Sequence, residues 1–263
     1  MESVLEQIQL ESIKEIILEA SCLFADRQAA GHRKTKGVAD YVTEVDFSVQ
    51  KFIRENLAKL YPAIQFMGEE KDNAEIDMDG LVWVLDPVDG TTNLIHDYRA
   101  SAISLALLNK KEPVLGIIYH PYLQEMYWAQ KGKGSFCNGE PIHVSSTQTM
   151  QESLIAVGTS PYYKHLAQQN FSIFQRVFEK CQDIRRSGSA AIDLAYVAAG
   201  RVEGFFEKDL KLWDFAAGML LVREAGGRVL DYEGEELRAE QMRSVVAGNA
   251  EIAQLLVSEY IHG

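Results

Sequence analysis

Apolar residues in the first sixty positions recur with a period close to 3.6, the repeat of an α-helix. The pattern predicts an amphipathic helix over residues 4–26 and a second over residues 46–60. Thr43–Asp46 resembles a capping box at the start of the second helix, and Pro62 ends it. Two helices are therefore expected before the first strand.

Apolar runs of strand length dominate the next eighty residues. They predict strands over residues 64–67, 81–85, 101–109, 114–119 and 126–129. The run at 81–85 is continuously apolar, which is typical of a buried strand. Turn residues separate the last three runs, and this hairpin-like spacing predicts antiparallel pairing.

Strands and helices alternate in the second half of the chain. The strands are expected over residues 154–157, 202–206, 228–231 and 244–247, and the helices over 171–180, 189–199, 215–225 and 251–260. No internal repeat or linker-like segment interrupts the chain. The mixture predicts a layered α/β protein, a single domain over residues 1–263 with approximate halves at 1–150 and 151–263.

The balance of charged residues indicates which classes of binding partner are unsuited to this chain. The 263 residues include 26 Lys and Arg against 38 Asp and Glu, so the formal net charge is −12. This balance argues against a nucleic-acid-binding module, and the short basic clusters Arg33–Lys36 and Arg185–Arg186 are typical of solvated faces. The longest strongly apolar run, residues 101–108, is too short to span a bilayer.

The N-terminus and the cysteines favour a cytoplasmic location. Met1–Ser3 opens neither a basic nor an apolar segment, so no signal peptide is expected. Cys22, Cys137 and Cys181 lie far apart without a C-x-x-C pair, which suits free thiols in a reducing compartment rather than a catalytic cysteine. A chain of this length folds without a metal, so a bound metal is expected to serve chemistry.

The segment Asp86–Asn93 directly follows the predicted buried strand. Taken alone, its Asp, Pro and Gly residues are typical of a tight turn. However, two carboxylates three residues apart leave a strand end, where sheets commonly present ligands. Gly90–Thr92 offers N–H groups and hydroxyls to an anion, especially if a helix begins there.

Three more acids have an ordinary and a functional interpretation. Glu69 belongs to an acidic pair after a strand, Asp214 opens a helix as an N-cap would, and Asp46 lies in a first helical turn. If these acids converge with Asp86 and Asp89, their charges repel and raise one another's pKa unless a cation is bound. An oxygen-only donor set selects Mg²⁺, Mn²⁺ or Ca²⁺ over zinc, and Mg²⁺ indicates phosphoryl chemistry.

Several segments together resemble the inositol monophosphatase family. Three principal motifs carry the resemblance: Gly68–Glu70, Trp83–Asn93 and Trp213–Gly218. Supporting stretches also match: Asp40–Asp46, Gly132–Gly139 and Gly188–Ala191. They occur in the family's order and at its usual spacing from about residue 5 to about residue 255.

The resemblance implies a five-layer αβαβα sandwich that forms a homodimer. It implies a Mg²⁺-dependent, lithium-sensitive phosphomonoesterase with two or three ions per subunit, where Mn²⁺ is a possible substitute. The expected substrate is inositol monophosphate or a related sugar or polyol phosphate. The expected reaction is in-line attack of a metal-activated water, without a phospho-enzyme.

Site residues also follow from the resemblance, position by position. The expected metal ligands are Glu69, Asp86, the Val88 carbonyl, Asp89 and Asp214, with Asp46 reached by a further ion or through water. Glu69 and Thr91 are expected to orient the attacking water, with Asp89 as a third catalytic residue. Gly90 and Thr91 are expected to bind the phosphate, and the remaining substrate contacts are Asp89, Gly188, Ser189, Ala190, Glu207 and Asp214.

Other interpretations of the same residues remain open. Haloacid-dehalogenase-like phosphatases also carry an Asp-Gly-Thr segment, but their Asp-x-Asp spacing differs from that of Asp86 and Asp89. A binding protein without catalysis would use the acids to hold a structural cation or a phosphorylated sugar. Within the family, fructose 1,6-bisphosphate, 3′-phosphoadenosine 5′-phosphate and NADP(H) are alternative substrates, and Arg185 and Arg186 would favour them if they point into the site.

Overall fold

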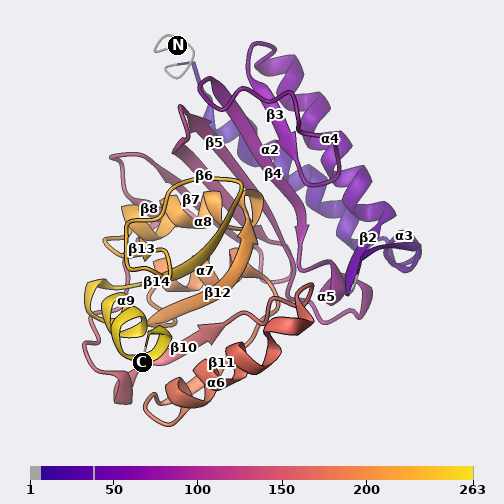
Figure 1. Ribbon diagram of the computed structural model, residues 1–263. Helices are drawn as coiled ribbons and strands as arrows, with labels where there is room; N and C mark the ends of the chain where they lie inside the picture. Colours follow the sequence, from indigo (N-terminus) through magenta and orange to yellow (C-terminus); the bar gives the residue numbers. More distant parts are fainter. Residues whose placement is uncertain (1–6, 38, 263) are drawn as a thin grey trace.

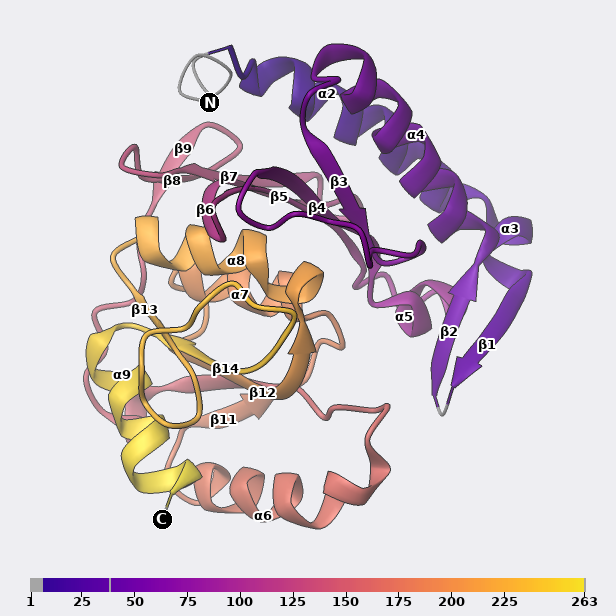
Figure 2. The same ribbon diagram turned by 45° about the horizontal axis from the view of Figure 1, so that its top comes forward.

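The computed structural model describes residues 7–37 and 39–262, which form five stacked layers. Helices α2 (Leu10–Ser21) and α4 (Glu44–Leu60) form one outer layer over a seven-stranded sheet. Helices α7 (Ala190–Ala198) and α8 (Leu212–Glu224) separate this sheet from a five-stranded sheet. Figure 2 shows the other outer layer, made by α6 (Ala167–Phe178) and α9 (Ala250–Leu255), beneath the second sheet. The expected αβαβα arrangement is confirmed.

The seven-stranded sheet is built from consecutive strands of the first half. Its order is β3-β4-β5-β6-β7-β8-β9, with β3 and β4 parallel and all later neighbours antiparallel. The bounds are β3 (Gln65–Gly68), β4 (Leu81–Asp89), β5 (Ala102–Asn109), β6 (Glu112–His120), β7 (Glu125–Gln130), β8 (Ser135–Cys137) and β9 (Glu140–Ile142).

The five-stranded sheet comes from the second half and has the order β11-β10-β12-β14-β13. β10 pairs in parallel with β11 and β12, whereas β14 pairs antiparallel with β12 and β13. The bounds are β10 (Leu154–Val157), β11 (Asp183–Arg185), β12 (Gly204–Lys211), β13 (Arg228–Leu230) and β14 (Met242–Gly248), and the covering helices are α6 (Ala167–Phe178) and α9 (Ala250–Leu255).

Small residues let the central helices pack closely between the two sheets. A side chain at Gly116 on β6 would come within 2.7 Å of the Ala217 carbonyl on α8. A side chain at Gly218 would meet Leu194 of α7 at 2.5 Å. This close contact places the N-terminus of α8 beside the strands of the first sheet (Figure 1).

The helix predicted over residues 4–26 is wrong in its extent. Residues 1–6 lie outside the part of the chain that the structure describes. They include Met1–Ser3 and the first residues of the predicted helix. Within it, α2 gives way to a 3₁₀ turn at Cys22–Ala25. The apolar pattern therefore covers α2 and this turn, and the Asp26 carboxylate then accepts two backbone N–H groups at the start of a separate helix, α3 (Arg27–Gly31).

The other predicted helices and strands are present, with ends that shift by a few residues. The last predicted helix is α9 followed by a π-helical turn at Leu256–Ile261. The sequence pattern missed β8, β9 and β11, and also the hairpin of β1 (Arg33–Gly37) and β2 (Asp40–Thr43). These strands are short or fully exposed, so they carry little hydrophobic signal.

The remaining short elements connect these layers. They are α5 (Thr91–Ile95) and the 3₁₀ turns η2 (Met150–Glu152) and η3 (Lys164–Leu166). None of the helices in the described part of the chain combines the length and apolar character needed to cross a membrane. Cys22, Cys137 and Cys181 are free thiols, as expected.

Candidate active site

Strand β4 delivers two acids to the same side of the sheet. Asp86 pairs with Ser104 of β5, and Asp89 pairs with Ala102. Three steps along β4 therefore correspond to two steps along β5. This β-bulge cancels the normal alternation of side chains, so acids three residues apart share a side. Pro87, which has no N–H group, is tolerated at such a bulge. The segment therefore continues the strand rather than forming a tight turn.

The chain leaves β4 through a glycine and enters a short helix. Gly90 has φ +91°, and a side chain there would come within 3.0 Å of the Ala100 carbonyl. The helix α5 then begins at Thr91, as the sequence suggested. The Thr91 hydroxyl lies 2.9 Å from Asp46 Oδ1 and 3.1 Å from the Val88 carbonyl.

Asp46 reaches this point from α4, where it completes the predicted capping box. Its Oδ2 accepts hydrogen bonds from the backbone N–H and the hydroxyl of Thr43. Oδ1 is thereby aimed at Thr91. Burial raises the pKa of Asp46 to about 6, although the hydrogen bonds from Thr43 act in the opposite direction.

Glu69 and Glu70 lie on a turn held by α4. Gln50 donates to the Glu70 carbonyl at 2.9 Å and accepts from the Glu70 N–H at 3.0 Å. A side chain at Gly68 would collide with Gln50 at 2.2 Å, so this contact requires glycine. The turn is thus fixed next to the end of β4, to which Glu69 N–H is bonded through the Leu85 carbonyl.

The cluster Arg33–Lys36 lies on an exposed strand, as predicted, but its last residue, Lys36, also pairs with the acids. From the β1–β2 hairpin, its ammonium reaches Glu69 at 2.8 Å and Glu70 at 2.7 Å. Burial acts to lower the pKa of Lys36, but the two carboxylates raise it above its ordinary value overall. Burial and the charge of Glu69 raise the pKa of Glu70 to about 7.

The second half of the chain supplies Asp214. This acid is the third residue of α8, and its Oδ2 accepts the Lys211 N–H at 2.7 Å, so it is not the N-cap itself. Asp89 in turn binds the start of α7, where Ser189 Oγ and Ala191 N–H both donate to its Oδ2 at 2.6 Å. The carboxylate of Asp89 thereby joins the two halves.

We call Glu69, Asp86, Asp89 and Asp214 the acid cluster. Burial, followed by the charges of Glu69, Asp89 and Asp214, raises the pKa of Asp86 well above its usual range. Burial and the charges of Asp89 and Glu69 do the same to the pKa of Asp214. Burial raises the pKa of Asp89 to about 6, against the hydrogen bonds from Ser189 and Ala191. The acids therefore lie close enough to repel one another.

The donor chemistry of the acid cluster fits a hard divalent cation. Its members offer only carboxylate oxygens, which Mg²⁺ prefers, and a bound cation would relieve their repulsion. Within residues 7–37 and 39–262, however, no three His, Cys, Asp or Glu side chains lie close enough to hold an ion as they stand. The carboxylates instead bind Lys36, Ser189 and neighbouring backbone N–H groups.

Glu207 lies in the middle of β12, where a bulge in the pairing with β14 begins. It accepts the Ser160 N–H at 2.9 Å, and a side chain at Gly158 would overlap its carboxyl group at 1.9 Å. Burial raises the pKa of Glu207 to about 7, and the charge of Asp89 adds to this effect. The predicted contacts Gly188, Ser189 and Ala190 begin α7 beside it, with Gly188 at φ +87°.

The two neighbouring arginines differ in where they point. Arg185 turns to Asp183 and the Ile184 carbonyl on the surface. Arg186 donates to Thr159 Oγ1 at 3.2 Å, and its Nη1 would lie 2.6 Å from a side chain at Gly188. Only Arg186 therefore lies beside the predicted substrate contacts, and its charge acts on the pKa of Glu207 to lower it.

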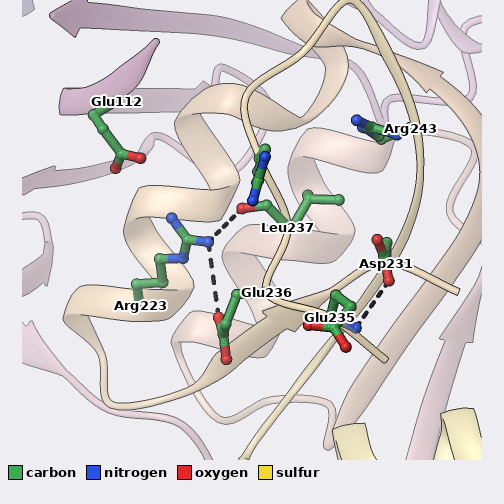
Figure 3. Close-up of a pocket in the computed structure, with 8 residues that line it drawn as sticks. Glu112, Arg223, Asp231, Glu235, Glu236, Leu237 and Arg243 are labelled. Atoms are coloured by element: carbon green, nitrogen blue, oxygen red, sulfur yellow. Dashed lines mark hydrogen bonds and ion pairs between the residues drawn. The ribbon is translucent and has the colours of Figure 1, made fainter. Parts of the chain in front are cut away.

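A separate cavity of about 480 Å³ lies away from these residues (Figure 3). Its charged groups are largely paired. Arg223 donates to the Leu237 carbonyl at 2.6 Å and lies 3.8 Å from Glu236, and Asp231 accepts the Glu235 N–H at 2.9 Å. None of the predicted site residues lines this cavity, so it gives no support to a second active site.

Sequence reasoning missed several residues that shape the acid cluster. They include Lys36, Gln50 and Asn93. Asn93 stood in a recognised motif, but its role was not visible. Its side chain donates to the Ala100 carbonyl at 2.6 Å and to the Ser187 carbonyl at 3.0 Å, which holds the two halves together.

Comparison with known proteins agrees with this arrangement. The sequence profile of the inositol monophosphatase family matches residues 1–261. An inositol-1-monophosphatase of Rhizobium meliloti (strain 1021) is 41% identical over 225 residues, covering 84% of this chain and 83% of that protein. The Nus factor SuhB of Escherichia coli (strain K12) is 39% identical over 223 residues, covering 85% and 83%. The crystal structure of the extragenic suppressor protein suhB from Bartonella henselae matches with a TM-score of 0.87 at 34% identity, covering 94% of this chain and 96% of that one. The chain belongs to the inositol monophosphatase family.

Proposed function

We propose that the protein is a Mg²⁺-dependent phosphomonoesterase that hydrolyses inositol monophosphate, or a related sugar or polyol phosphate, to the free alcohol and inorganic phosphate. The acid cluster carries the proposal, because its four carboxylates come from three separate elements and repel one another. Membership of the family supports a metal-dependent phosphatase. The name of the Rhizobium relative supports inositol 1-phosphate as the substrate.

The chain's own oxygens would hold the cations. The proposed ligands are Glu69, Asp86, Asp89, Asp214 and the carbonyl of Val88, for two or three Mg²⁺ ions, with Mn²⁺ as a substitute. Asp46 is bonded to Thr43 and Thr91, so it would reach a cation only through water or at a further site. When bound, such cations acidify water and neutralise charge on the phosphoryl group.

Thr91 is suited to orient the attacking water. Its hydroxyl carries one proton, which it can donate to Asp46 or to the Val88 carbonyl. Its oxygen lone pairs then remain free to accept a hydrogen bond from water. Together with Glu69, Thr91 would fix that water for attack in line with the leaving alcohol. The N–H groups of Gly90 and Thr91 would bind the phosphate oxygens.

The alcohol portion of the substrate would face the second half of the chain. Glu207 would accept hydrogen bonds from its hydroxyl groups, next to Gly188, Ser189 and Ala190. A buried carboxylate suits a neutral polyol, because it repels a second phosphate. Arg186 partly offsets this charge, so fructose 1,6-bisphosphate, 3′-phosphoadenosine 5′-phosphate and NADP(H) remain the alternative substrates within the family.

The proposal includes three further properties that follow from the resemblance of the motifs. The enzyme acts as a homodimer, lithium inhibits it, and it works in the cytoplasm on a small phosphorylated substrate. Three free thiols suit that compartment. Sedimentation and lithium titration of the active enzyme test the first two properties.

The deciding experiment is inorganic phosphate release from inositol 1-phosphate, with Mg²⁺ titrated upward from an excess of chelator. We expect saturable, strictly metal-dependent release with kcat/KM above about 10⁴ M⁻¹s⁻¹, the low end of ordinary enzymes. Feeble metal-dependent release would transfer the substrate assignment to the bisphosphates and nucleotides, tested in the same assay. No release from folded protein with any of them would refute the proposal and favour a binding protein.

A further inference from the structure

Asn93 is a buried polar residue of α5 that the proposed reaction does not use. The residue is 6% exposed, and its side-chain amide carries two N–H bonds. Both are donated to backbone carbonyls, one to Ala100 at 2.6 Å and one to Ser187 at 3.0 Å. Ala100 precedes β5 in the first half of the chain, whereas Ser187 lies just before α7 in the second half. A single amide group therefore holds backbone from both halves.

The same amide packs against two glycines that belong to opposite ends of the proposed substrate site. A side chain at Gly90 would come within 3.3 Å of Asn93 Nδ2, and a side chain at Gly188 would come within 3.0 Å of the same atom. The two glycines also approach each other, because a side chain at Gly90 would lie 3.2 Å from the Gly188 carbonyl. Two turns from different halves are thus in close contact beside Asn93.

Local hydrogen bonds fix each of these turns within its own half. The Gly90 carbonyl accepts the Ser101 hydroxyl at 2.9 Å and the Leu94 N–H at 3.1 Å. In the second half, the Ser187 hydroxyl donates to the Ser189 carbonyl at 3.0 Å. Each turn therefore has contacts that do not depend on the side chain of Asn93.

Asp89 makes another link between the halves, through the hydrogen bonds that it accepts from Ser189 and Ala191. However, Asp89 is itself one of the proposed cation ligands, so its substitution would remove a ligand as well as a link. Asn93 lies outside the proposed ligands of cation and substrate. Substitution of Asn93 therefore changes how the two halves are held without removing a group that binds either one.

We propose that Asn93 is a positioning residue that sets the distance between the phosphate turn, Gly90–Thr91, and the alcohol turn, Gly188–Ala190. This inference rests on the proposed function, in which the phosphate turn binds the phosphate and the alcohol turn faces the leaving alcohol. Attack in line requires both ends of the ester to be held in one geometry relative to the water. Without the amide of Asn93, each turn would keep its own contacts while their separation is no longer fixed.

The test separates alignment of the ester from binding of its phosphate. In Asn93→Ala we expect kcat for inositol 1-phosphate to fall about 100-fold, as for a misplacement of about 1 Å, while KM changes less than about threefold. The Ki of inorganic phosphate, which needs only the phosphate turn and the cations, should change less than about twofold. Asn93→Ser keeps one donor and should lose kcat about tenfold; this variant carries the test if Asn93→Ala does not fold.

Asn249 provides the matched control. It is 8% exposed, and its amide likewise donates to two backbone carbonyls, those of Ser145 at 3.0 Å and Thr147 at 2.7 Å. Asn249 precedes α9, which Figures 1 and 2 show on the opposite side of the molecule from α5. Asn249→Ala should lower the Tm about as much as Asn93→Ala, because each leaves buried carbonyls unpaired, but its kcat should stay within about twofold of the wild type.

Each result has a distinct meaning. A wild-type enzyme that releases no phosphate from any ester refutes the proposed function itself. With an active wild type, an unchanged kcat in a folded Asn93 variant would overturn the positioning role. A rise in the Ki of inorganic phosphate that matches the loss of kcat would also overturn it, because Asn93 would then shape the phosphate turn alone. The same holds if Asn249→Ala reproduces the loss of kcat, because the effect then follows stability.

Discussion

The two halves of the chain meet at the acid cluster but contribute to it in different ways. Asp86 and Asp89 come from one buried strand of the first half, and Glu69 from the turn beside it. Their positions are fixed by a β-bulge and by backbone hydrogen bonds. The second half contributes the start of α8, which carries Asp214, and strand β12, which carries Glu207.

We propose that this difference separates reaction chemistry from substrate choice. Groups that must hold cations and phosphate gain from rigid strand ends, where small displacements are resisted. Groups that recognise the alcohol can vary with the loops that present them. Changes in the first half should therefore abolish turnover with every substrate. Changes in the second half, apart from Asp214, should alter the ranking of substrates.

The largest effect is expected from Asp89→Asn, which removes one charge from the acid cluster. We expect turnover of every phosphate ester to fall at least 100-fold, as when a key electrostatic group is lost. The fold should persist, because an amide oxygen can still accept the hydrogen bonds from Ser189 and Ala191. Steady-state assays combined with circular dichroism check both points. Retention of more than about a tenth of the activity would contradict the role of Asp89.

The pH dependence of stability tests the repulsion directly. Asp46 and Asp89 have pKa values of about 6 in the fold against an ordinary 3.8, about 3 kcal/mol each by linkage. A raised pKa means that the carboxyl group is protonated more readily in the folded state than in the unfolded state. Its contribution to the free energy of unfolding is therefore fully present below pH 4 and is lost as pH rises through 6. Without metal, the Tm of the wild type should fall from pH 5 to pH 7.5.

Asp89→Asn provides the control for this titration, since it removes one of the carboxyl groups whose pKa burial raises into this range. Its metal-free Tm should fall less steeply over the same range, and added Mg²⁺ should raise the wild-type Tm more at pH 7.5 than at pH 5. Parallel curves for the two proteins would show that Asp89 does not titrate as described.

A smaller and substrate-dependent effect is expected from Glu207→Gln in the second half. Loss of a charged hydrogen-bond acceptor should lower kcat/KM for inositol 1-phosphate about tenfold. Phenyl phosphate has no hydroxyl groups for Glu207, so its hydrolysis should change little. Equal losses for the two substrates would mean that Glu207 acts on the acid cluster and does not bind the alcohol. That result would contradict the proposal that the second half of the chain determines substrate choice.

The smallest effect is expected from Lys36→Met. Lys36 pairs with Glu69 and Glu70 at a partly exposed position, where such a pair accounts for up to about 1 kcal/mol. Removal of its charge should lower the half-saturating Mg²⁺ concentration about fivefold. Lys34→Met on the same strand makes the same change in net charge away from these acids. If Lys36→Met instead needs more Mg²⁺ for half-saturation, the ammonium group of Lys36 does not compete with the cation for these carboxylates.

The sequence predicted those parts of the site that depend on local pattern. The capping box at Thr43–Asp46 is set by neighbouring residues, and it is confirmed. The sequence left open whether a helix begins after Gly90, and α5 begins there. The five layers followed from the resemblance, and the order of strands and helices agrees with them. The halves at 1–150 and 151–263 and the individual site roles stay predictions.

Contacts between distant elements could not be predicted in the same way. Lys36 lies in a run of exposed residues, so its pairing with Glu69 depends on how the β1–β2 hairpin folds back. The β-bulge in β4 depends on pairing with β5, and the segment alone is typical of a turn.

The central claim, that the acid cluster holds the cations which bind the phosphate, is tested most directly by anomalous diffraction. Crystals would be grown with Mn²⁺ and an unreactive analogue of inositol 1-phosphate. We expect two or three anomalous peaks bounded by Glu69, Asp86, Asp89 and Asp214, with the phosphate next to Gly90 and Thr91. Peaks elsewhere, or none among these four carboxylates in crystals that contain Mn²⁺, would contradict it.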